Sequence, residues 1–205
     1  MAFAMRFLVR LANLGKSEPS DAKALASSAH ELVREYGADV GNLRVSRTAI
    51  ELDLLLSSRD GLSSATHALE ERLGPLLTMR ELDTAPPPMD VDYAIREGVA
   101  LFNEERYWES HEALEYGWRR VEGPEKEVLQ GIILVAAALV HLQKNELGVA
   151  LGVMTRASDK LSPYHGERFG IGIDNLRETV SRMVVDGRPD FFKIEARPYS
   201  SRAAA

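Results

Sequence analysis

Residues 129–142 read LQGIILVAAALVHL, which is the most informative stretch for the architecture of the C-terminal half. Wound as a helix at 100° per residue, it points apolar side chains in nearly every direction. A helix without a polar face is stable only when other helices surround it. Gly131 and the alanines at 136–138 are small enough for those neighbours to approach closely. The stretch therefore predicts a buried helix, residues 124–144, at the centre of a bundle.

The pattern is helical from residue 90 onward. Apolar spacing predicts further helices at residues 90–103, 106–121, 146–161 and 175–185. Gly123-Pro124 marks the start of the central helix, because proline is favoured at the first helical position. The glycine-containing residues 164–172 are expected to be a connecting loop. Residues 89–205 are thus expected to form an all-α helical bundle.

The first 84 residues have a different pattern. Alternating apolar residues predict strands at 5–11, 50–56 and 76–82, and a further strand is expected to begin at Leu43. Helices are expected from about Ser17 to Tyr36 and over residues 62–73. This βαββαβ order predicts a ferredoxin-like domain over residues 1–84.

The two patterns meet at Ala85-Pro86-Pro87-Pro88. Consecutive prolines cannot continue a helix or a central strand, and they favour an extended spacer. We therefore expect a proline linker at residues 85–88. The sequence predicts an α+β chain with two domains.

The composition excludes several classes of protein. The 205 residues are 45% hydrophobic and 27% charged, as in ordinary globular proteins. A net charge of −6 argues against a nucleic-acid partner, since nucleic-acid-binding domains are usually basic. The longest apolar run, residues 132–140, is far shorter than the ~20 residues of a membrane helix. With no cysteine, disulfides and thiolate metal sites are excluded, and a cytoplasmic location is expected.

Polar and aromatic residues are densest at residues 107–118, YWESHEALEYGW, which contain both tryptophans. Helical spacing places Tyr107, His111, Leu114 and Trp118 on one stripe. His111 is therefore expected to point inward, with Glu115 one turn later as its partner. With two residues of the central helix added, the candidate ligand cluster is Trp108, Glu109, His111, Glu112, Glu115, Trp118, Gln130 and His141.

The pattern W-E-x-H-E-x-L-E-x-x-W, followed by Leu129-Gln130-Gly131 and a small-residue apolar helix, resembles the family called domain of unknown function 309. The resemblance covers residues 94–161. It implies a helical bundle around a buried central helix and no agreed activity. One departure is Leu134, where the family often carries a glutamine, and it shortens any polar row along the central helix.

Three interpretations of His111 remain open. His111, Glu112 and Glu115 could offer three ligands to a divalent metal, with Gln130 and His141 completing the site. A neutral His111 oriented by Glu115 could act as a general base. A histidine beside a carboxylate could also be a paired structural group that holds two helices in register. The spacing differs from H-E-x-x-H, so the metalloprotease motif is absent.

A weak internal repeat has a period of forty residues. It aligns Gly98 with Ala138, Phe102 with Leu142, Tyr107 with Leu147, Ser110 with Ala150, and Leu114 with Met154. Each copy would be a helical hairpin. Periods of this length occur in stacked hairpins that form peptide-binding surfaces.

Two functional hypotheses follow. The first is a non-catalytic, cytoplasmic helical module that binds a protein or a small ligand, with the N-terminal domain supporting a homodimer or a sensing role. The second is a metal-dependent enzyme, for example a hydrolase, that uses His111, Glu112 and Glu115. No motif specifies a cofactor, although a divalent metal is compatible with the cluster. Neither hypothesis involves a membrane or a nucleic acid.

Overall fold

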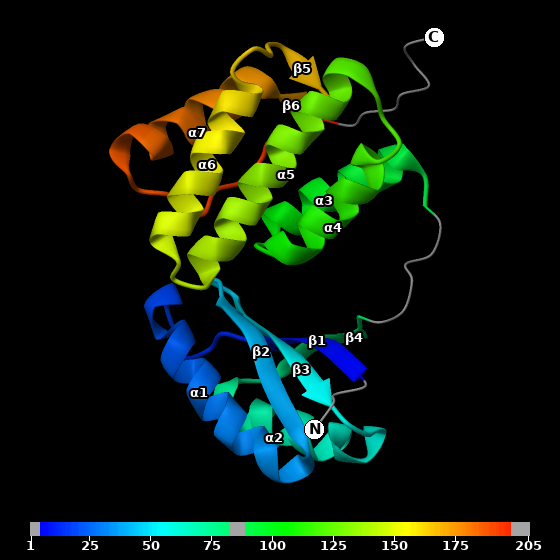
Figure 1. Cartoon of the computed structure of the whole chain (residues 1–205), viewed down its shortest axis with the longest axis vertical. Helices are drawn as coiled ribbons and strands as arrows, with labels where there is room; N and C mark the ends of the chain where they lie inside the picture. The colour runs from blue at the N-terminus through cyan, green and yellow to red at the C-terminus, as the bar shows by residue number, and fades with distance from the viewer. Residues whose placement is uncertain (1–4, 83–88, 198–205) are drawn as a thin grey trace. The chain divides into compact units, whose positions relative to one another are not determined.

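The computed structural model describes residues 5–82 and 89–197 (Figure 1). The chain divides into an N-terminal and a C-terminal compact unit. The predicted proline linker, residues 85–88, lies outside the described residues. None of the helices within the described residues is both long and apolar enough to cross a membrane.

The N-terminal unit follows the order strand, helix, strand, strand, helix, strand. A single antiparallel sheet has the strand order β2-β3-β1-β4. Short 3-10 turns precede α1, follow it and precede α2 (Pro19–Asp21, Arg34–Tyr36 and Arg59–Gly61). The main elements are β1 (Met5–Ala12), α1 (Ala22–Val33), β2 (Ala38–Val45), β3 (Ala49–Leu56), α2 (Leu62–Leu73) and β4 (Leu76–Glu81).

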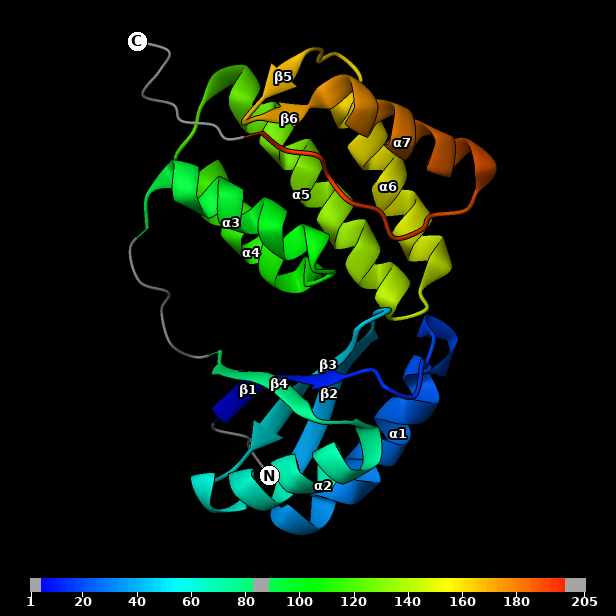
Figure 2. The same ribbon diagram turned by 180° about the vertical axis from the view of Figure 1, so that it is seen from behind.

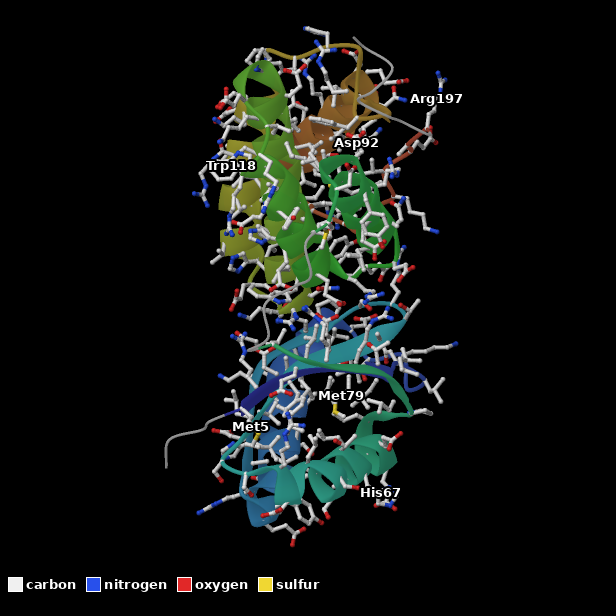
Figure 3. All side chains as sticks on the ribbon, turned by 90° about the vertical axis from the view of Figure 1, so that its right-hand side faces the viewer. Met5, His67, Met79, Asp92, Trp118 and Arg197 are labelled. Carbon is white, nitrogen blue, oxygen red and sulfur yellow. The ribbon has the colours of Figure 1, made fainter. Side chains whose placement is uncertain are left out.

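Helix α1 and helix α2 cover one face of this sheet (Figures 1 and 2). Val9 of β1 pairs with Leu52 of β3, and both are fully buried beneath the helices. At the edge, Met79 of β4 lies between the sheet and α2 (Figure 3), with its sulfur 3.9 Å from the Thr66 hydroxyl. The alternation of apolar residues in β1 and β3 thus produces the core that it predicts.

Strand β2 begins earlier than expected, at Ala38 instead of Leu43. Gly37 adopts a left-handed conformation (φ 68°) that ends the preceding helical turn, so the strand starts directly after it. The pairing with β3 then shifts between Gly41 and Arg44, where Asn42 also has positive φ (48°). This bulge interrupts the apolar alternation and hides the first half of the strand from a periodicity argument.

The C-terminal unit is helical apart from one short ribbon. Its elements are α3 (Val91–Asn103), α4 (Tyr107–Trp118), α5 (Gly123–Gln143), α6 (Leu147–Leu161), β5 (Glu167–Arg168), β6 (Ile171–Gly172) and α7 (Ile173–Asp186). The two-residue strands β5 and β6 correct the expectation of an all-α unit with an irregular loop here. Gly166, Phe169 and Gly170 all adopt positive φ, which permits the tight turns of this ribbon.

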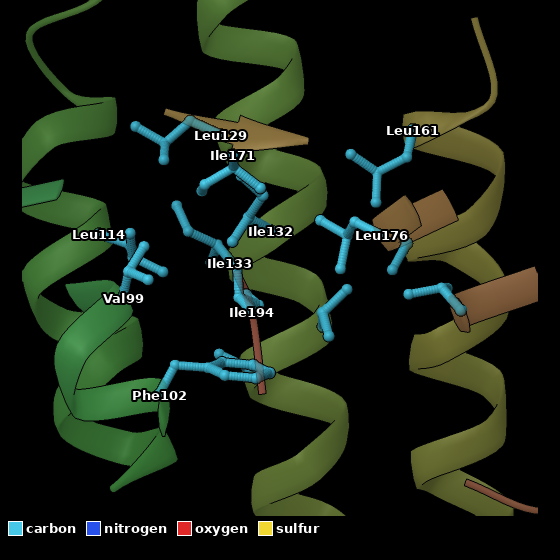
Figure 4. Close-up of a cluster of buried hydrophobic side chains, with 14 of the residues drawn as sticks. Val99, Phe102, Leu114, Leu129, Ile132, Ile133, Leu161, Ile171, Leu176 and Ile194 are labelled. Carbon is cyan, nitrogen blue, oxygen red and sulfur yellow. The ribbon is translucent and has the colours of Figure 1, made fainter. Parts of the chain in front are cut away.

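Helix α5 supplies much of the core of this unit. Ile132 and Leu129 are fully buried, and Leu114, Leu161 and Leu176 converge on α5 from α4, α6 and α7 (Figure 4). The remaining α5 core residues are Val128, Ile133, Val135, Ala136, Ala138 and Leu139. A helix that is apolar nearly all round is therefore surrounded by packing partners.

A substitution pair tests how tightly α5 and α6 pack. A Cβ atom at Gly131 would lie 2.6 Å from two Leu161 side-chain atoms, whereas one at Gly152 of α6 would meet nothing within 4 Å. Overpacking costs about 1–3 kcal/mol, and alanine in a helix gains about 1 kcal/mol over glycine. Gly131→Ala is expected to lower the melting temperature and Gly152→Ala to raise it. Equal shifts in thermal unfolding would show that the interface adapts freely.

The two helical hairpins, α3–α4 and α5–α6, have equivalent turns. The backbone angle φ is 61° at Glu105 and 60° at Asn145, forty residues later. The next residues are also alike: Arg106 has φ −91° and ψ 57°, and Glu146 has φ −100° and ψ 59°. Non-glycine residues with positive φ are uncommon, so the coincidence indicates a shared turn design.

Hydrogen bonds repeat with the same spacing. The Arg106 amide donates to the Leu101 carbonyl at 3.0 Å, and the Glu146 amide donates to the His141 carbonyl at 2.9 Å. Both bonds span five residues and end the first helix of each hairpin. The forty-residue repeat in the sequence thus corresponds to two structurally equivalent hairpins.

Candidate functional site

Helix α4 packs tightly on α3, and this contact sets the orientation of the cluster. The Ser110 hydroxyl donates to the Gly98 carbonyl at 2.8 Å, and a Cβ atom at Gly98 would lie 2.6 Å from Leu114. The buried row of α4 is Tyr107, Ser110, Leu114 and Gly117. The expected inward stripe therefore holds at Tyr107 and Leu114, and Trp118 is partly buried against the core. His111 lies outside the buried row, which the small residues Ser110 and Gly117 complete.

His111 lies on the flank of α4, where its side chain is 26% exposed. Its ring stacks on that of Trp108, with centroids 6.1 Å apart and planes 8° from parallel. The His111 Nε2 atom is 4.0 Å from a Glu115 oxygen, beyond hydrogen-bond distance. The other Glu115 oxygen accepts a hydrogen bond from Arg119 at 2.9 Å. His111 and Glu115 are thus neighbours without a tight ion pair.

Two further cluster residues have structural contacts. The Glu109 carboxylate accepts two hydrogen bonds from Arg106, at 2.7 and 2.8 Å, and this pairing raises the pKa of the Arg106 guanidinium above its usual range. The Lys126 ammonium lies 4.5 Å from the centre of the Trp118 ring. The buried Trp118 indole N–H has no hydrogen-bond partner among the described residues. The Arg106–Glu109 pair closes the first turn of α4, and the Lys126–Trp118 contact joins the end of α4 to α5.

Gln130 and His141 do not converge on one site. They lie on the same side of α5, but eleven residues correspond to a rise of about 16 Å. His141 Nδ1 instead contacts a Glu146 carboxylate oxygen at 2.5 Å, at the start of α6. Gln130 is half-buried on the first half of α5.

Metal-binding geometry is not assembled at the predicted ligands. Glu112 is exposed on α4, while Glu115 is engaged by Arg119. Across residues 5–82 and 89–197, no three histidine or carboxylate side chains are grouped so that they could hold a metal ion. Trp108, His111 and Glu115 are brought together; Glu109, Trp118, Gln130 and His141 have separate surroundings.

A cavity lies elsewhere, between α7 and residues 192–197. We call it the α7 groove, and its volume is about 730 Å³. Its lining mixes apolar, polar and charged side chains, among them Leu176, Thr179, Arg182, Lys193 and Glu195. None of the eight residues of the predicted cluster lines it. The sequence predicted a candidate site on α4, whereas this cavity lies beside α7.

Residues 190–197, here called the strap, cross the face of α5 between the α3–α4 hairpin and α7 (Figure 2). The Asn103 side-chain amide donates to the Ile194 carbonyl at 2.9 Å, and its oxygen accepts from the Ile194 amide at 2.8 Å. At its end, the Arg197 amide donates to the Gly170 carbonyl at 2.8 Å. The backbone of the strap is thus hydrogen-bonded to the Asn103 side chain and to the β5–β6 ribbon.

Aromatic side chains anchor the strap. The Phe192 ring packs edge-on against Phe102, with centroids 5.3 Å apart, and Phe191 lies 5.8 Å from Tyr107. Ile194 is buried in the core beside Phe102 (Figure 4). None of these strap residues was among the candidate residues predicted from the sequence. The available signal was the apolar run Phe191, Phe192 and Ile194 shortly after Pro189, in a region without helical periodicity.

A polar group ties the ribbon to the start of α7. Asp174 accepts a hydrogen bond from the Gly166 amide at 2.8 Å, and His165 Nδ1 lies 2.8 Å from its other oxygen. Arg177 Nη1 is 2.9 Å from the same His165 nitrogen. The hydrogen bond from the Gly166 amide, and after it the one with His165, holds the pKa of the Asp174 carboxyl below its usual range.

The lowered pKa makes the stability of this region sensitive to acid. A carboxylate with a depressed pKa stabilises the fold above its unfolded pKa, and this contribution disappears as pH falls through the folded pKa. Asp174→Asn is expected to lower the melting temperature at neutral pH, and its difference from wild type is expected to shrink as pH falls through the lowered pKa of Asp174. Glu178→Gln on the same helix is the control. A pH-independent difference would contradict the assignment.

Part of the helical unit matches a known protein family. Residues 95–153 match the model of the domain of unknown function 309 (DUF309). No curated protein matches the chain.

The DUF309 match covers less than half of the chain, but it contains the features shared by the hairpins. It begins at Ile95 in α3 and ends at Val153 in α6, so it includes both equivalent turns and the whole of α4. The resemblance predicted from the WESHEALEYGW pattern is therefore confirmed. Helix α7, the α7 groove and the strap lie beyond the matched DUF309 residues.

Proposed function

We propose that the helical unit is a non-catalytic binding module for an extended segment of another protein. The observation that carries this proposal is the equivalence of the α3–α4 and α5–α6 turns, with Glu105 and Asn145 at φ 61° and 60°. Repeated helical hairpins stack on their neighbours and present continuous surfaces to partners. The unit therefore has the construction of a small repeat protein, closed by α7.

The α7 groove supports a polypeptide as the ligand. Its volume of about 730 Å³ would accept several residues of an extended chain. Charged side chains of both signs border it, with Glu178 and Glu195 beside Arg182 and Lys193. Small-molecule pockets are usually mostly apolar, with a few placed polar groups. A lining of mixed polarity suits a peptide, which combines a polar backbone with side chains of differing polarity.

For the N-terminal unit we propose a ferredoxin-like domain, with the proline segment as the boundary between two domains. The strand order β2-β3-β1-β4, with both helices on one face, supports this assignment. A homodimer through this domain and a cytoplasmic location remain predictions from the sequence.

The metal-dependent alternative makes a contrasting prediction for His111. As a ligand, it would retain metal that His111→Ala loses. As a packing residue stacked on Trp108, its removal is expected to cost about 1 kcal/mol of stability and to change no metal content. Elemental mass spectrometry on both proteins, purified without chelator or affinity metal, separates these outcomes.

The proposed function is tested by selection of peptides from a displayed random library on the immobilised full chain. We expect enriched peptides whose binding is weakened by Arg182→Ala in the α7 groove, with Glu112→Gln on α4 as the matched control. Failure to enrich any peptide, together with a stoichiometric metal that His111→Ala loses, would overturn the proposal in favour of the enzyme.

A further inference from the structure

The strap is bound to the helical unit in the manner of a ligand. It is an extended segment that pairs with the ribbon through one isolated bridge, Ala196 to Ile171, and none of the strands in the described part of the chain pairs with Ile194. The backbone amide and carbonyl of that residue are instead satisfied by the two ends of a single side chain, Asn103. A carboxamide provides one acceptor and two donors, so it can pair with a peptide backbone of any sequence. This contact recognises an extended chain and is indifferent to the side chain that it carries.

Specificity in this contact comes from alternate side chains. Phe192 meets Phe102 and Ile194 is buried in the core, whereas Lys193 and Glu195, which alternate with them, are exposed. All four line the α7 groove. Backbone pairing for affinity with alternating pockets for selectivity is a general mode of peptide recognition. Phe191 adds a second aromatic contact, with Tyr107.

The position of the strap also fits a separable segment. Helix α7 ends at Asp186, where Gly187 adopts a left-handed conformation (φ 63°), and Pro189 follows two residues later. The strap begins after this break and shares no helical hydrogen bonds with α7. On its other side lies the α7 groove, so its displacement would join the groove to the surface of Phe102, Asn103 and Tyr107.

We propose that the strap occupies a peptide-binding site from within the same chain, and that the partner is an extended peptide with two consecutive aromatic residues, any residue, and then an aliphatic residue. The inference rests on the proposed function and names its partner class. Residues 191–194, Phe-Phe-Lys-Ile, are the internal copy of that pattern. A partner must compete with a tethered segment, so the apparent affinity depends on the fraction of molecules in which the strap is open.

The test measures binding in trans by fluorescence polarisation. The probe is a labelled peptide of residues 188–197, RPDFFKIEAR, added to the full chain as wild type and as the Phe192→Ser/Ile194→Ser variant. The variant keeps the site but weakens the internal competitor. We expect it to bind the probe at least about tenfold more tightly than wild type does. The peptide RPDFSKSEAR should not bind, and adding Asn103→Ala should abolish the gain.

If the double variant fails to fold, the milder Ile194→Ala variant is used in the same assay. Equal probe affinity for wild type and a folded strap variant would overturn the inference, as would a gain unaffected by Asn103→Ala. Library peptides that bind the full chain while RPDFFKIEAR does not bind either strap variant would reject this inference and leave the proposed function standing. If neither the library peptides nor RPDFFKIEAR bind, both this inference and the proposed function are rejected.

Discussion

Replacing Phe102 with alanine is expected to lower the free energy of unfolding of the helical unit by about 3–5 kcal/mol. Phe102 is fully buried and packs edge-on against Tyr107 at 4.9 Å and Phe192 at 5.3 Å, measured between ring centroids. Truncation leaves a cavity where α3, α4 and the strap meet, and its cost is large because close-packed neighbours fill such a cavity only in part. Urea denaturation followed by circular dichroism measures the loss.

Tyr93 on the same helix provides the matched control, since it is 50% exposed. Tyr93→Ala is expected to change the free energy of unfolding by no more than about 0.5 kcal/mol. A cost below about 1 kcal/mol for Phe102→Ala would mean that this junction is loosely packed. Such loose packing would leave the aromatic contacts of Phe191 and Phe192 without a stabilising role.

The second large effect is expected in the N-terminal unit, at Asp53. Its carboxylate accepts hydrogen bonds from Arg6 at 2.6 and 3.1 Å, from Asn42 at 2.7 Å and from Arg44 at 3.4 Å. Hydrogen bonds to charged groups contribute about 1.5–3 kcal/mol each, and they are not additive. Asp53→Ala leaves two guanidinium groups without the shared anion, and about 3 kcal/mol of stability is expected to be lost.

Asp60→Ala is the control for this prediction, since Asp60 is exposed and its carboxylate accepts only a long Ser58 hydroxyl contact of 3.3 Å within the described hydrogen bonds. The control is expected to alter stability by no more than about 0.5 kcal/mol. If the Asp53→Ala and Asp60→Ala variants unfold at the same temperature, the hydrogen bonds of Asp53 with Arg6, Asn42 and Arg44 contribute nothing measurable to stability.

Local patterns predicted the elements of the chain well. The alternation around Leu52 and Leu54 depends on one face of a sheet being buried, and the all-apolar stretch at residues 129–142 depends on a helix being surrounded. Both are properties of nearby residues. The start of β2 was wrong because the Gly41–Asn42 bulge breaks the period of two on which the prediction relied.

The orientation of α4 could not be read from periodicity. Large residues such as His111 and Trp118 suggested the buried stripe, but α3 approaches α4 so closely that only Ser110 and Gly117 fit between larger neighbours. The partner of a helix, and not its own pattern, decided which row is inside. The histidine-centred cluster therefore became a partly exposed flank, and its function stays a prediction.

The strap depends on contacts that no local pattern encodes. Asn103 and Ile194 are 91 residues apart, and the amide that joins them has no characteristic spacing. The repeat, in contrast, was visible in the sequence because large apolar residues flank both turns at the same spacing, Phe102 and Tyr107 in one hairpin and Leu142 and Leu147 in the other. The hairpins could be anticipated from the sequence, and the strap could not.

Native-state hydrogen exchange on the wild-type chain tests the central claim most directly. If the strap is an internal ligand of a peptide site, the Ile194 amide should exchange through a local opening, at least about 100-fold faster than core amides of α5 such as that of Ala136. Exchange of Ile194 and Ala136 with the same opening free energy would show that the strap unfolds only with the whole unit. That result would contradict a displaceable strap and make residues 190–197 an integral part of the helical core.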